Sequence, residues 1–289
     1  METSPVSPAT ESTAARVSVS QISLLINTIF ASFLVSGSVS WLYYADRLME
    51  FPAGMLGVAV GTILLPSLSR HFASGAAEEY GKLLDWGLRV TLLLAVPAAA
   101  ALAVLALPLI ATLFHYGRFS DEDAWMTRQA LVAYSLGLVG MILVKILAPG
   151  FYARQNVVTP VKIGLFTLAA TQVMNLAFIV PLKHAGLALA IGLGACLNAA
   201  LLYRDLRRHG IYSPQPGWVA FVARIAAAVT AMAAALHYAM GPAAWWLGAH
   251  WQQKVPAVAG LVLLGAVSYL GLLYAFGMRW RDFQRREAS

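Results

Sequence analysis

The sequence is poor in charged residues. Only 11% of its 289 residues are Asp, Glu, Lys or Arg, whereas a soluble globular domain usually has about 25%. Hydrophobic residues make up 60% of the chain, and the mean hydropathy is +0.70. This composition excludes an ordinary soluble domain and predicts a membrane protein whose apolar segments lie against lipid and against one another.

Cysteine is almost absent, because Cys196 is the only one in the chain. A single cysteine excludes an intrachain disulfide and a metal site built from thiolates, and its apolar surroundings predict a small buried side chain. The six histidines are dispersed and form no HExxH motif. The sequence therefore predicts no metal, no cofactor and no catalytic residues.

Positive charge prevails without forming a cluster. The formal net charge is +7, but the 20 Lys and Arg residues are scattered at the ends of apolar runs. Nucleic-acid-binding domains instead gather basic residues on one face or segment. The distribution argues against a nucleic-acid partner and is typical of residues that set membrane topology.

Apolar runs long enough to cross a bilayer alternate with polar breaks along the chain. A crossing needs about 20 apolar residues, and neither a soluble domain nor a Gly-rich phosphate loop interrupts the pattern. We predict an all-α, polytopic membrane protein of about eight transmembrane helices, at residues 19–36, 38–65, 86–107, 127–148, 161–180, 185–203, 218–239 and 255–276.

The basic residues also predict the orientation, since Lys and Arg are retained on the cytoplasmic side. Twelve of them lie in the two terminal segments and in three of the breaks, against four in the opposite breaks. Both termini are therefore expected in the cytoplasm. Arg89, Arg224 and Lys145 fall near helix ends on that side, where they can snorkel, so only Arg47 is expected well inside the membrane.

The domain organisation follows from the same pattern. Residues 1–18 are rich in Ser, Thr, Ala and Pro, lack the basic and apolar regions of a signal peptide, and predict a disordered tail. Residues 19–205 are expected to form a six-helix bundle. Residues 218–276 add two helices, and residues 277–289 form a basic cytoplasmic tail.

The run YYADRLMEFPAG carries three charged residues inside a predicted helix. Arg47 and Glu50 are three residues apart and share a face, whereas Asp46 points about 100° away. Ionised groups in a membrane helix cost several kcal/mol unless they face a partner or a watery cavity. A guanidinium grips phosphate with two parallel hydrogen bonds, so we interpret Arg47 as an anion-binding residue. The alternative is a pair with Glu50 that only neutralises itself.

A proline and a glycine follow these charges. Pro52 removes a backbone hydrogen bond about one turn beyond Arg47, and Gly54 comes two residues later. Together they predict a kink or hinge in this helix. An anion-binding group beside a bend is typical of a cavity that moves.

The small and aromatic residues predict features of the fold rather than a binding or catalytic site. The segment GLGACLN at 192–198, with Gly57 and Gly61, indicates close packing between helices. Tryptophans between the last two helices predict a belt at the membrane interface: Trp245, Trp246 and Trp251.

Two other sets of polar residues have competing interpretations. The acids Asp121, Glu122 and Asp123 could serve a lipid-linked glycosyltransferase, but Ser120 three residues before Asp123 is typical of a helix capping box. The membrane amides are interpreted as contacts between helices rather than as cation ligands. These amides are Asn27, Gln172, Asn175 and Asn198.

Four strings together resemble the carboxy-terminal part of the MurJ (MviN) family, the lipid II flippases of bacterial peptidoglycan synthesis. The resemblance runs from about Val17 to the C-terminus and rests on long, ordered matches rather than on one short motif. The strings are VSQISLLINTIFASFLVSGSVSWLYYADRLMEFPAGMLGVAVGTILLPSLS, LAPGFYARQNVVTPVK, HAGLALAIGLGACLNA and QPGW.

This resemblance implies a fold of the multidrug/oligosaccharidyl-lipid/polysaccharide exporter (MOP) superfamily, with two helical lobes around a central cavity. It implies a transporter rather than an enzyme, one that moves undecaprenyl-pyrophosphate-linked precursor across the inner membrane by alternating access. In the family pattern Arg47 contacts the charged head of the substrate, and Ser40 faces the cavity from the same helix. Asp46 and Glu50 are expected beside them, and the last two helices are expected to form a groove for the lipid tail.

The sequence departs from the family pattern, because it contains no counterpart of the amino-terminal six-helix lobe. Alternating access needs two bodies that rock about a site between them, so this chain is not expected to flip lipid II unaided. The expected partners are lipid II, membrane lipids, and a separate amino-terminal lobe or other cell-wall synthesis proteins.

The sequence also bears on the driving force of transport and leaves alternative functions open. Sodium coupling is not expected, because the candidate ligands are amides rather than carboxylates, which leaves the membrane potential as the driving force. The alternatives are a non-transporting scaffold in cell-wall synthesis, another polysaccharide-lipid exporter, and a membrane glycosyltransferase that uses the acids at 121–123.

Overall fold

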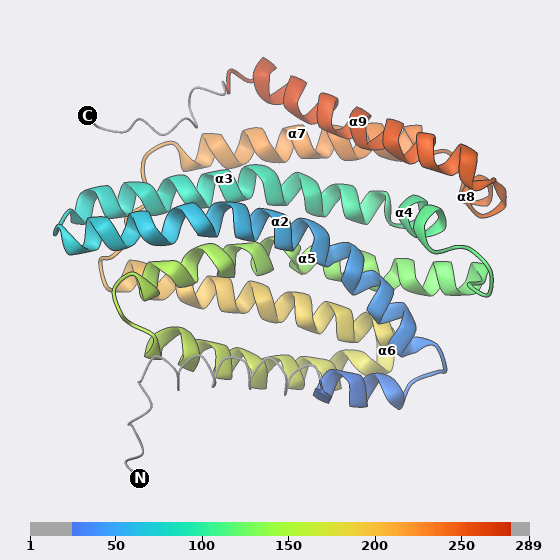
Figure 1. The fold of residues 1–289 in the computed structure, drawn as a ribbon, viewed down its shortest axis with the longest axis horizontal. Helices are drawn as coiled ribbons and strands as arrows, with labels where there is room; N and C mark the ends of the chain where they lie inside the picture. Colours follow the sequence, from blue (N-terminus) through green and yellow to red (C-terminus); the bar gives the residue numbers. More distant parts are fainter. Residues whose placement is uncertain (1–24, 279–289) are drawn as a thin grey trace, which may run out of the picture.

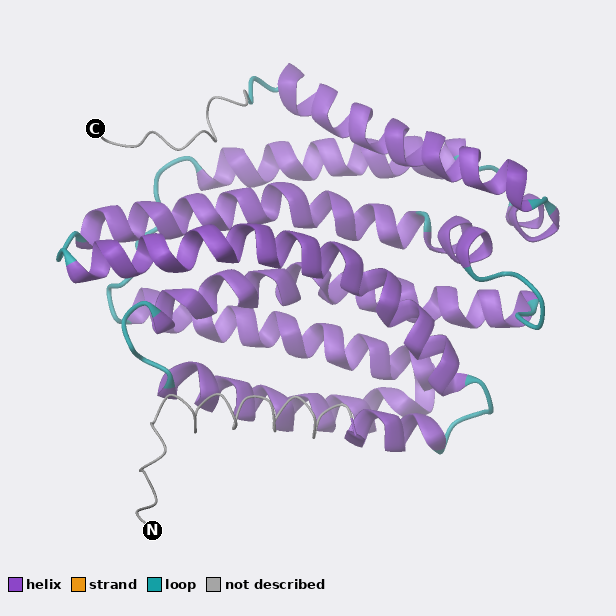
Figure 2. Cartoon of the chain, viewed as in Figure 1, coloured by secondary structure: helices purple, strands orange, loops and turns teal. Residues whose placement is uncertain are grey.

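The computed structural model describes residues 25–278, and every regular element in that range is a helix (Figure 2). The all-α fold predicted from the apolar runs is confirmed. The expected tail at 1–18, residues 19–24 of the first expected helix, and residues 279–289 of the expected basic tail lie outside the described residues.

Eight helices are labelled in Figure 1, and residues 25–32 form a further helix without a label. The labelled helices are α2 (Ser38–Ala73), α3 (Ala77–Val104), α4 (Ala106–Leu113), α5 (Asp121–Tyr152), α6 (Val158–Arg208), α7 (Trp218–Ala239), α8 (Ala243–Gly248) and α9 (Trp251–Ala275).

Helix α6 crosses the membrane twice. It is 51 residues long, about 76 Å at 1.5 Å per residue, whereas the hydrocarbon core of a bilayer is about 30 Å thick. Lys183 interrupts it with φ 51° and ψ −130°, and Figure 1 shows its two halves folded back alongside each other. Six described helices are long and apolar enough to span a membrane. With α6 counted as two helices, these make seven of the eight expected crossings; the helix at 25–32 lies within the remaining expected crossing, 19–36, part of which is outside the described residues.

The connections between helices are shorter than predicted. The expected break at 66–85 is wrong, because only residues 74–76 separate α2 from α3. The prediction ended each helix where charged residues begin, but the helices continue beyond the apolar runs into segments rich in charged residues. There, ion pairs such as Lys82 with Glu78, 2.8 Å apart, support a helical surface in water. The same extension shortens two other breaks, 149–162 to 153–157 and 204–217 to 209–217.

Two short helices, α4 and α8, are absent from the sequence prediction. Helix α4 follows α3 after a one-residue break, so the expected helix 86–107 is in fact two segments. Helix α8 contains Trp245 and Trp246. The predicted interfacial belt is wrong for Trp246, which is buried and donates from its indole nitrogen to the carbonyl of Met240 at 2.6 Å. Trp245 and Trp251 are exposed.

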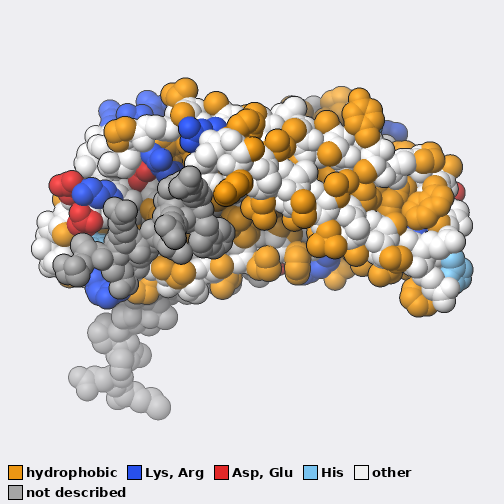
Figure 3. Space-filling model, turned by 90° about the horizontal axis from the view of Figure 1, so that it is seen from above, with side chains coloured by type: hydrophobic (Ala, Val, Ile, Leu, Met, Phe, Trp, Pro, Cys, Tyr) orange, Lys and Arg blue, Asp and Glu red, His pale blue; other side chains and the backbone are white. Residues whose placement is uncertain are grey.

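Polar residues concentrate at one end of the helical bundle. The connections 74–76, 153–157 and 209–217 meet at this end, at the left of Figure 1, and we call it the basic end. Figure 3 shows most Lys and Arg side chains towards the same end and hydrophobic side chains across the middle. An apolar middle between polar ends is typical of membrane-spanning proteins, and the chain is a multi-pass membrane protein.

Helix α5 lies at the centre and packs against α2, α3 and α6 (Figure 1). Where α5 crosses α6 the backbones touch, because a Cβ on Gly137 would lie 2.0 Å from the Cα of Gly192. Gly57 of α2 similarly leaves room for the side chain of Lys145 from α5. The close packing predicted for the segment at 192–198 and for Gly57 is therefore present.

A buried carboxylate attaches the last helices to the rest of the bundle. Asp85 on α3 has a side chain that is 4% exposed, and its Oδ1 accepts hydrogen bonds from the Tyr212 hydroxyl at 2.6 Å and the Trp218 indole at 2.7 Å. The backbone N–H of Gln215 also donates to Oδ1, and Arg89 donates to Oδ2 at 2.8 Å. Burial and the bond to Asp85 raise the pKa of the Tyr212 hydroxyl, so it remains a donor. The QPGW segment is thereby fixed against α3.

Candidate functional site

One face of α2 is left uncovered by the rest of the described fold. Met49 and Ala53 on the other side of this helix are buried in the core, whereas residues at three- and four-residue spacing are exposed or half-buried, as expected for one side of a helix. We call this set the open face of α2. It consists of Ser40, Tyr43, Arg47, Glu50, Gly54, Val58 and Thr62.

Arg47 forms the predicted pair with Glu50 on this face. The Arg47 Nη1 atom lies 2.6 Å from Glu50 Oε2, and the two side chains are 52% and 60% exposed. The guanidinium also lies over the Tyr43 ring, 4.9 Å from its centroid. A guanidinium has five N–H groups, and Glu50 is its one hydrogen-bond acceptor among the described residues. Arg47 therefore keeps donors that can bind an anionic ligand.

Helix α2 bends along its length, as Figure 1 shows between its steep beginning and its straight second part beside α3. Pro52 lies inside the helix, and a proline there both removes a hydrogen bond and crowds the preceding turn. A Cβ added to Gly54 would meet nothing within 4 Å. Open space therefore lies beside the backbone immediately after the charged residues.

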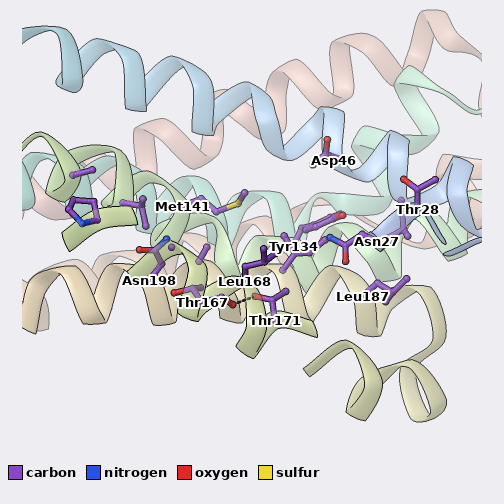
Figure 4. A pocket seen from close by; sticks show the side chains of 18 of the residues that line it. Asn27, Thr28, Asp46, Tyr134, Met141, Thr167, Leu168, Thr171, Leu187 and Asn198 are labelled. Carbon is purple, nitrogen blue, oxygen red and sulfur yellow. Dashed lines mark hydrogen bonds between the residues drawn. The ribbon is translucent and has the colours of Figure 1, made fainter. Parts of the chain in front are cut away.

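Asp46 lies on a different side of α2 and faces a cleft inside the bundle. The cleft has a volume of about 750 Å³ and is walled by α2, α5, both halves of α6 and the helix at 25–32. Figure 4 shows Asp46, Tyr134 and Asn198 among its lining residues. Asp46 therefore faces the cleft while Arg47 lies on the open face, and Tyr43 of the open face also lines the cleft.

The membrane amides join helices within the same region. Asn175 Nδ2 donates to Asn27 Oδ1 at 2.8 Å and to Gln172 Oε1 at 3.0 Å, so the first half of α6 is tied to the helix at 25–32. Asn198 lines the cleft, and its Oδ1 has no hydrogen-bond partner among the described residues. The bond between Asn27 and Asn175 is the kind of contact between helices that the sequence indicated.

Lys145 is a second cation whose amine reaches the middle of α2, and sequence reasoning missed this contact. The sequence placed this residue at a helix end, with its side chain reaching towards the cytoplasm. Its ammonium instead donates to the carbonyl of Ala53 on α2, at 3.0 Å. Ala53 lies near the middle of α2, one residue beyond Pro52. Lys145 is therefore not in the last turn of its helix, as the sequence suggested, because α5 continues for seven residues beyond it, to Tyr152.

The acids at 121–123 serve the start of α5. The Ser120 hydroxyl accepts a hydrogen bond from the backbone N–H of Asp123, whose carboxylate accepts from the backbone N–H of Ser120, so the predicted capping box is present. Asp123 also accepts a bond from the Trp41 indole at 2.7 Å. Asp121 lies 2.8 Å from Nε2 of His115. Within residues 25–278, no three His, Cys, Asp or Glu side chains form a group that could hold a metal ion.

Comparison with known proteins gives consistent matches. A family model described as "Lipid II flippase MurJ" matches residues 9–255. The lipid II flippase MurJ of Burkholderia cenocepacia is 50% identical over 271 residues, which are 93% of this chain and 52% of that protein. The probable lipid II flippase MurJ of Vibrio cholerae is 42% identical over 268 residues, 93% of this chain and 51% of that protein. The chain thus spans about half the length of the curated relatives it matches.

Two solved structures share the fold. A lipid II flippase MurJ in an inward closed conformation superposes with a TM-score of 0.75 at 23% identity, covering 92% of this chain and 52% of that one. An outward-facing MATE family transporter of the MOP superfamily gives a TM-score of 0.59 at 15% identity, covering 91% and 63%. At these identities the likeness concerns the fold alone, and it agrees with the helical architecture implied by the sequence.

Proposed function

The chain belongs to the MurJ family of lipid II flippases, and on that premise we propose that the open face of α2 forms one wall of a path by which lipid II crosses the bacterial inner membrane. The observation that carries the proposal is the exposure of Arg47 inside a membrane-length helix. An ionised side chain in that position is costly unless it meets a partner or a watery cavity. The diphosphate of the substrate supplies an anion that a guanidinium binds through two hydrogen bonds.

In this proposal, the open face of α2 needs a second helical lobe to enclose the path of the substrate. The open face carries Ser40 and Thr62 beside the Arg47–Glu50 pair, and lipid would be a poor neighbour for these polar groups. Alternating access rocks two bodies about a site between them. The proposed transport unit is therefore this chain with an amino-terminal lobe, and this chain alone does not transport. The groove for the lipid tail is assigned to α7 and α9.

Orientation and driving force are part of the same proposal. The connections at the basic end carry Lys and Arg, which cells retain in the cytoplasm, so both termini are assigned to that side. A driving force from the membrane potential is proposed rather than sodium coupling, because the bond between Asn27 and Asn175 uses amide groups in place of acidic ligands.

Complementation of a flippase-depleted bacterial strain tests the proposal. We expect no rescue by this chain alone and rescue when it is co-expressed with the first half of the Burkholderia cenocepacia relative. Arg47→Ala should abolish that rescue, since no guanidinium remains to bind the diphosphate. The control is the amount of each variant in the membrane fraction, measured by immunoblotting.

Other results of the complementation experiment would favour one of the alternative functions. Rescue by this chain alone would remove the second body from the mechanism. Rescue that survives Arg47→Ala but is lost in an Asp121→Asn/Asp123→Asn double variant would favour a membrane glycosyltransferase. An absence of rescue in every combination, with all chains present in the membrane, would favour a non-transporting scaffold.

A further inference from the structure

Lys145 is a cation without an anion partner. It lies in α5, within a stretch long and apolar enough to span a membrane, and none of the ion pairs among the described residues includes it. Its single hydrogen-bond acceptor there is the neutral carbonyl of Ala53, 3.0 Å from Nζ. An intramembrane charge that no counter-ion neutralises is expected to serve a ligand.

The ammonium lies close to the open face of α2. Gly57 leaves room for the Lys145 chain, since a Cβ at Gly57 would lie 2.3 Å from Lys145 Cδ and 3.4 Å from Nζ. Gly54 follows Arg47 by seven residues and therefore lies on nearly the same side of the helix. The space above Gly54 is open. Along α2, the exposed Glu50 and the side-chain-free Gly54 therefore lie between Arg47 and the glycine that makes room for the ammonium.

The two cations are offset along the helix axis. Ala53 follows Arg47 by six residues, a rise of about 9 Å, and it lies on the side of the basic end because α2 runs towards that end. An anion moving along the open face would therefore meet the two charges one after the other.

We propose that Lys145 is a second anion-binding residue on the open face of α2, which takes the diphosphate of an isoprenyl-diphosphate-linked lipid on the basic-end side of Arg47. This inference rests on the proposed function of that face. The ammonium exchanges the Ala53 carbonyl for phosphate oxygens, because its positive charge is attracted more strongly by the full negative charge of a phosphate than by the partial charge of a carbonyl oxygen. Lysine suits this exchange, since its compact charge sits on a flexible stem.

Binding of farnesyl diphosphate and of farnesol to the full chain in nanodiscs of zwitterionic lipid tests the proposal. The key variant is Lys145→Gln, whose amide is a hydrogen-bond donor like the ammonium but carries no charge. We expect it to weaken farnesyl diphosphate binding about tenfold, the loss of one charge-assisted contact, and to leave farnesol binding unchanged. Lys82→Gln is the matched control, because Lys82 lies exposed at the basic end, paired with Glu78 and Glu79.

Further variants distinguish a binding role from a structural one. Lys145→Arg keeps the charge and should retain most of the affinity. If Lys145→Gln and Lys145→Met both bind farnesyl diphosphate like the wild type, with or without a change in thermal unfolding, Lys145 only ties α5 to α2 and the inference is wrong. If Arg47→Ala alone weakens binding, the proposed function stands without Lys145. If the wild-type chain does not distinguish the diphosphate from the alcohol, both proposals are overturned.

Discussion

Charged side chains inside the helices differ in how fully the protein satisfies them. Asp85 accepts four hydrogen bonds and is buried, which is the environment of a structural charge. Arg47 has one exposed partner, and Lys145 has one neutral acceptor. The satisfied carboxylate fixes the fold, whereas the two incompletely satisfied cations remain available to a ligand.

Replacing Asp85 tests its structural role. Asp85→Ala removes the acceptor of the Tyr212 hydroxyl and the Trp218 indole and leaves Arg89 without its anion, so we expect a loss of roughly 3 kcal/mol of stability. Limited proteolysis should show faster cleavage in the linker 209–217, and thermal unfolding should begin at lower temperature. Glu79→Gln is the control, because an exposed pair contributes at most about 1 kcal/mol. Equal protease resistance in both variants would show that the linker is held by other contacts.

At the residue scale, the sequence correctly predicted on which side of a helix a residue lies, because this depends only on spacing within that helix. Spacing placed Arg47 and Glu50 on one face and Asp46 on another, and the structure agrees. Lys145 was misplaced for two physical reasons. A helical side chain points back towards the N-terminus of its own helix, which for Lys145 is away from the basic end. It also needs Gly57 opposite it, and the pairing of α2 with α5 is not encoded in either segment alone.

At the scale of elements, the crossing of α5 and α6 depends on glycine. Gly137→Ala would place a Cβ 2.0 Å from the Cα of Gly192, so backbone must move, and we expect a loss of about 1–3 kcal/mol. Gly164→Ala is the matched control within α6, because its Cβ would meet nothing within 4 Å. There the better helix propensity of alanine should leave stability unchanged or higher. Thermal unfolding in detergent measures both. A Gly137→Ala variant as stable as Gly164→Ala would contradict the close crossing.

Helix existence was predictable from hydropathy, and helix length was not. Each expected crossing that falls within residues 25–278 has a counterpart, because a run of about 20 apolar residues has no other stable form in lipid. The ends were misjudged where helices continue into water, as α2 and α3 do around residues 74–76. The short helix α4 packs against α5, α9 and α8, and α8 packs against α4; apolar patterning does not specify these contacts between distant segments.

The whole molecule consists of a bundle from the helix at 25–32 through α6, with α7 and α9 attached along α3 (Figure 1). The Asp85 bonds hold this attachment at the basic end. At the other end, Lys254 of α9 donates to the carbonyl of Ala111 on α4, at 3.3 Å. Both attachments lie beside α3 and α4, and the open face of α2 remains free. This free face is the surface on which we propose contact with substrate and with a second lobe.

Photocrosslinking in living cells tests whether the open face of α2 lies along the path of the substrate. A photoreactive residue replaces Val58 on that face, and in a matched variant it replaces Val173 on α6, away from the open face and from α7 and α9; these valines are 63% and 67% exposed. Both variants are co-expressed with the first half of the Burkholderia cenocepacia relative in cells carrying radiolabelled peptidoglycan precursor. We predict that irradiation attaches labelled lipid to the Val58 variant and not to the Val173 variant. Equal labelling of both positions, or labelling at Val173 alone, would contradict the account.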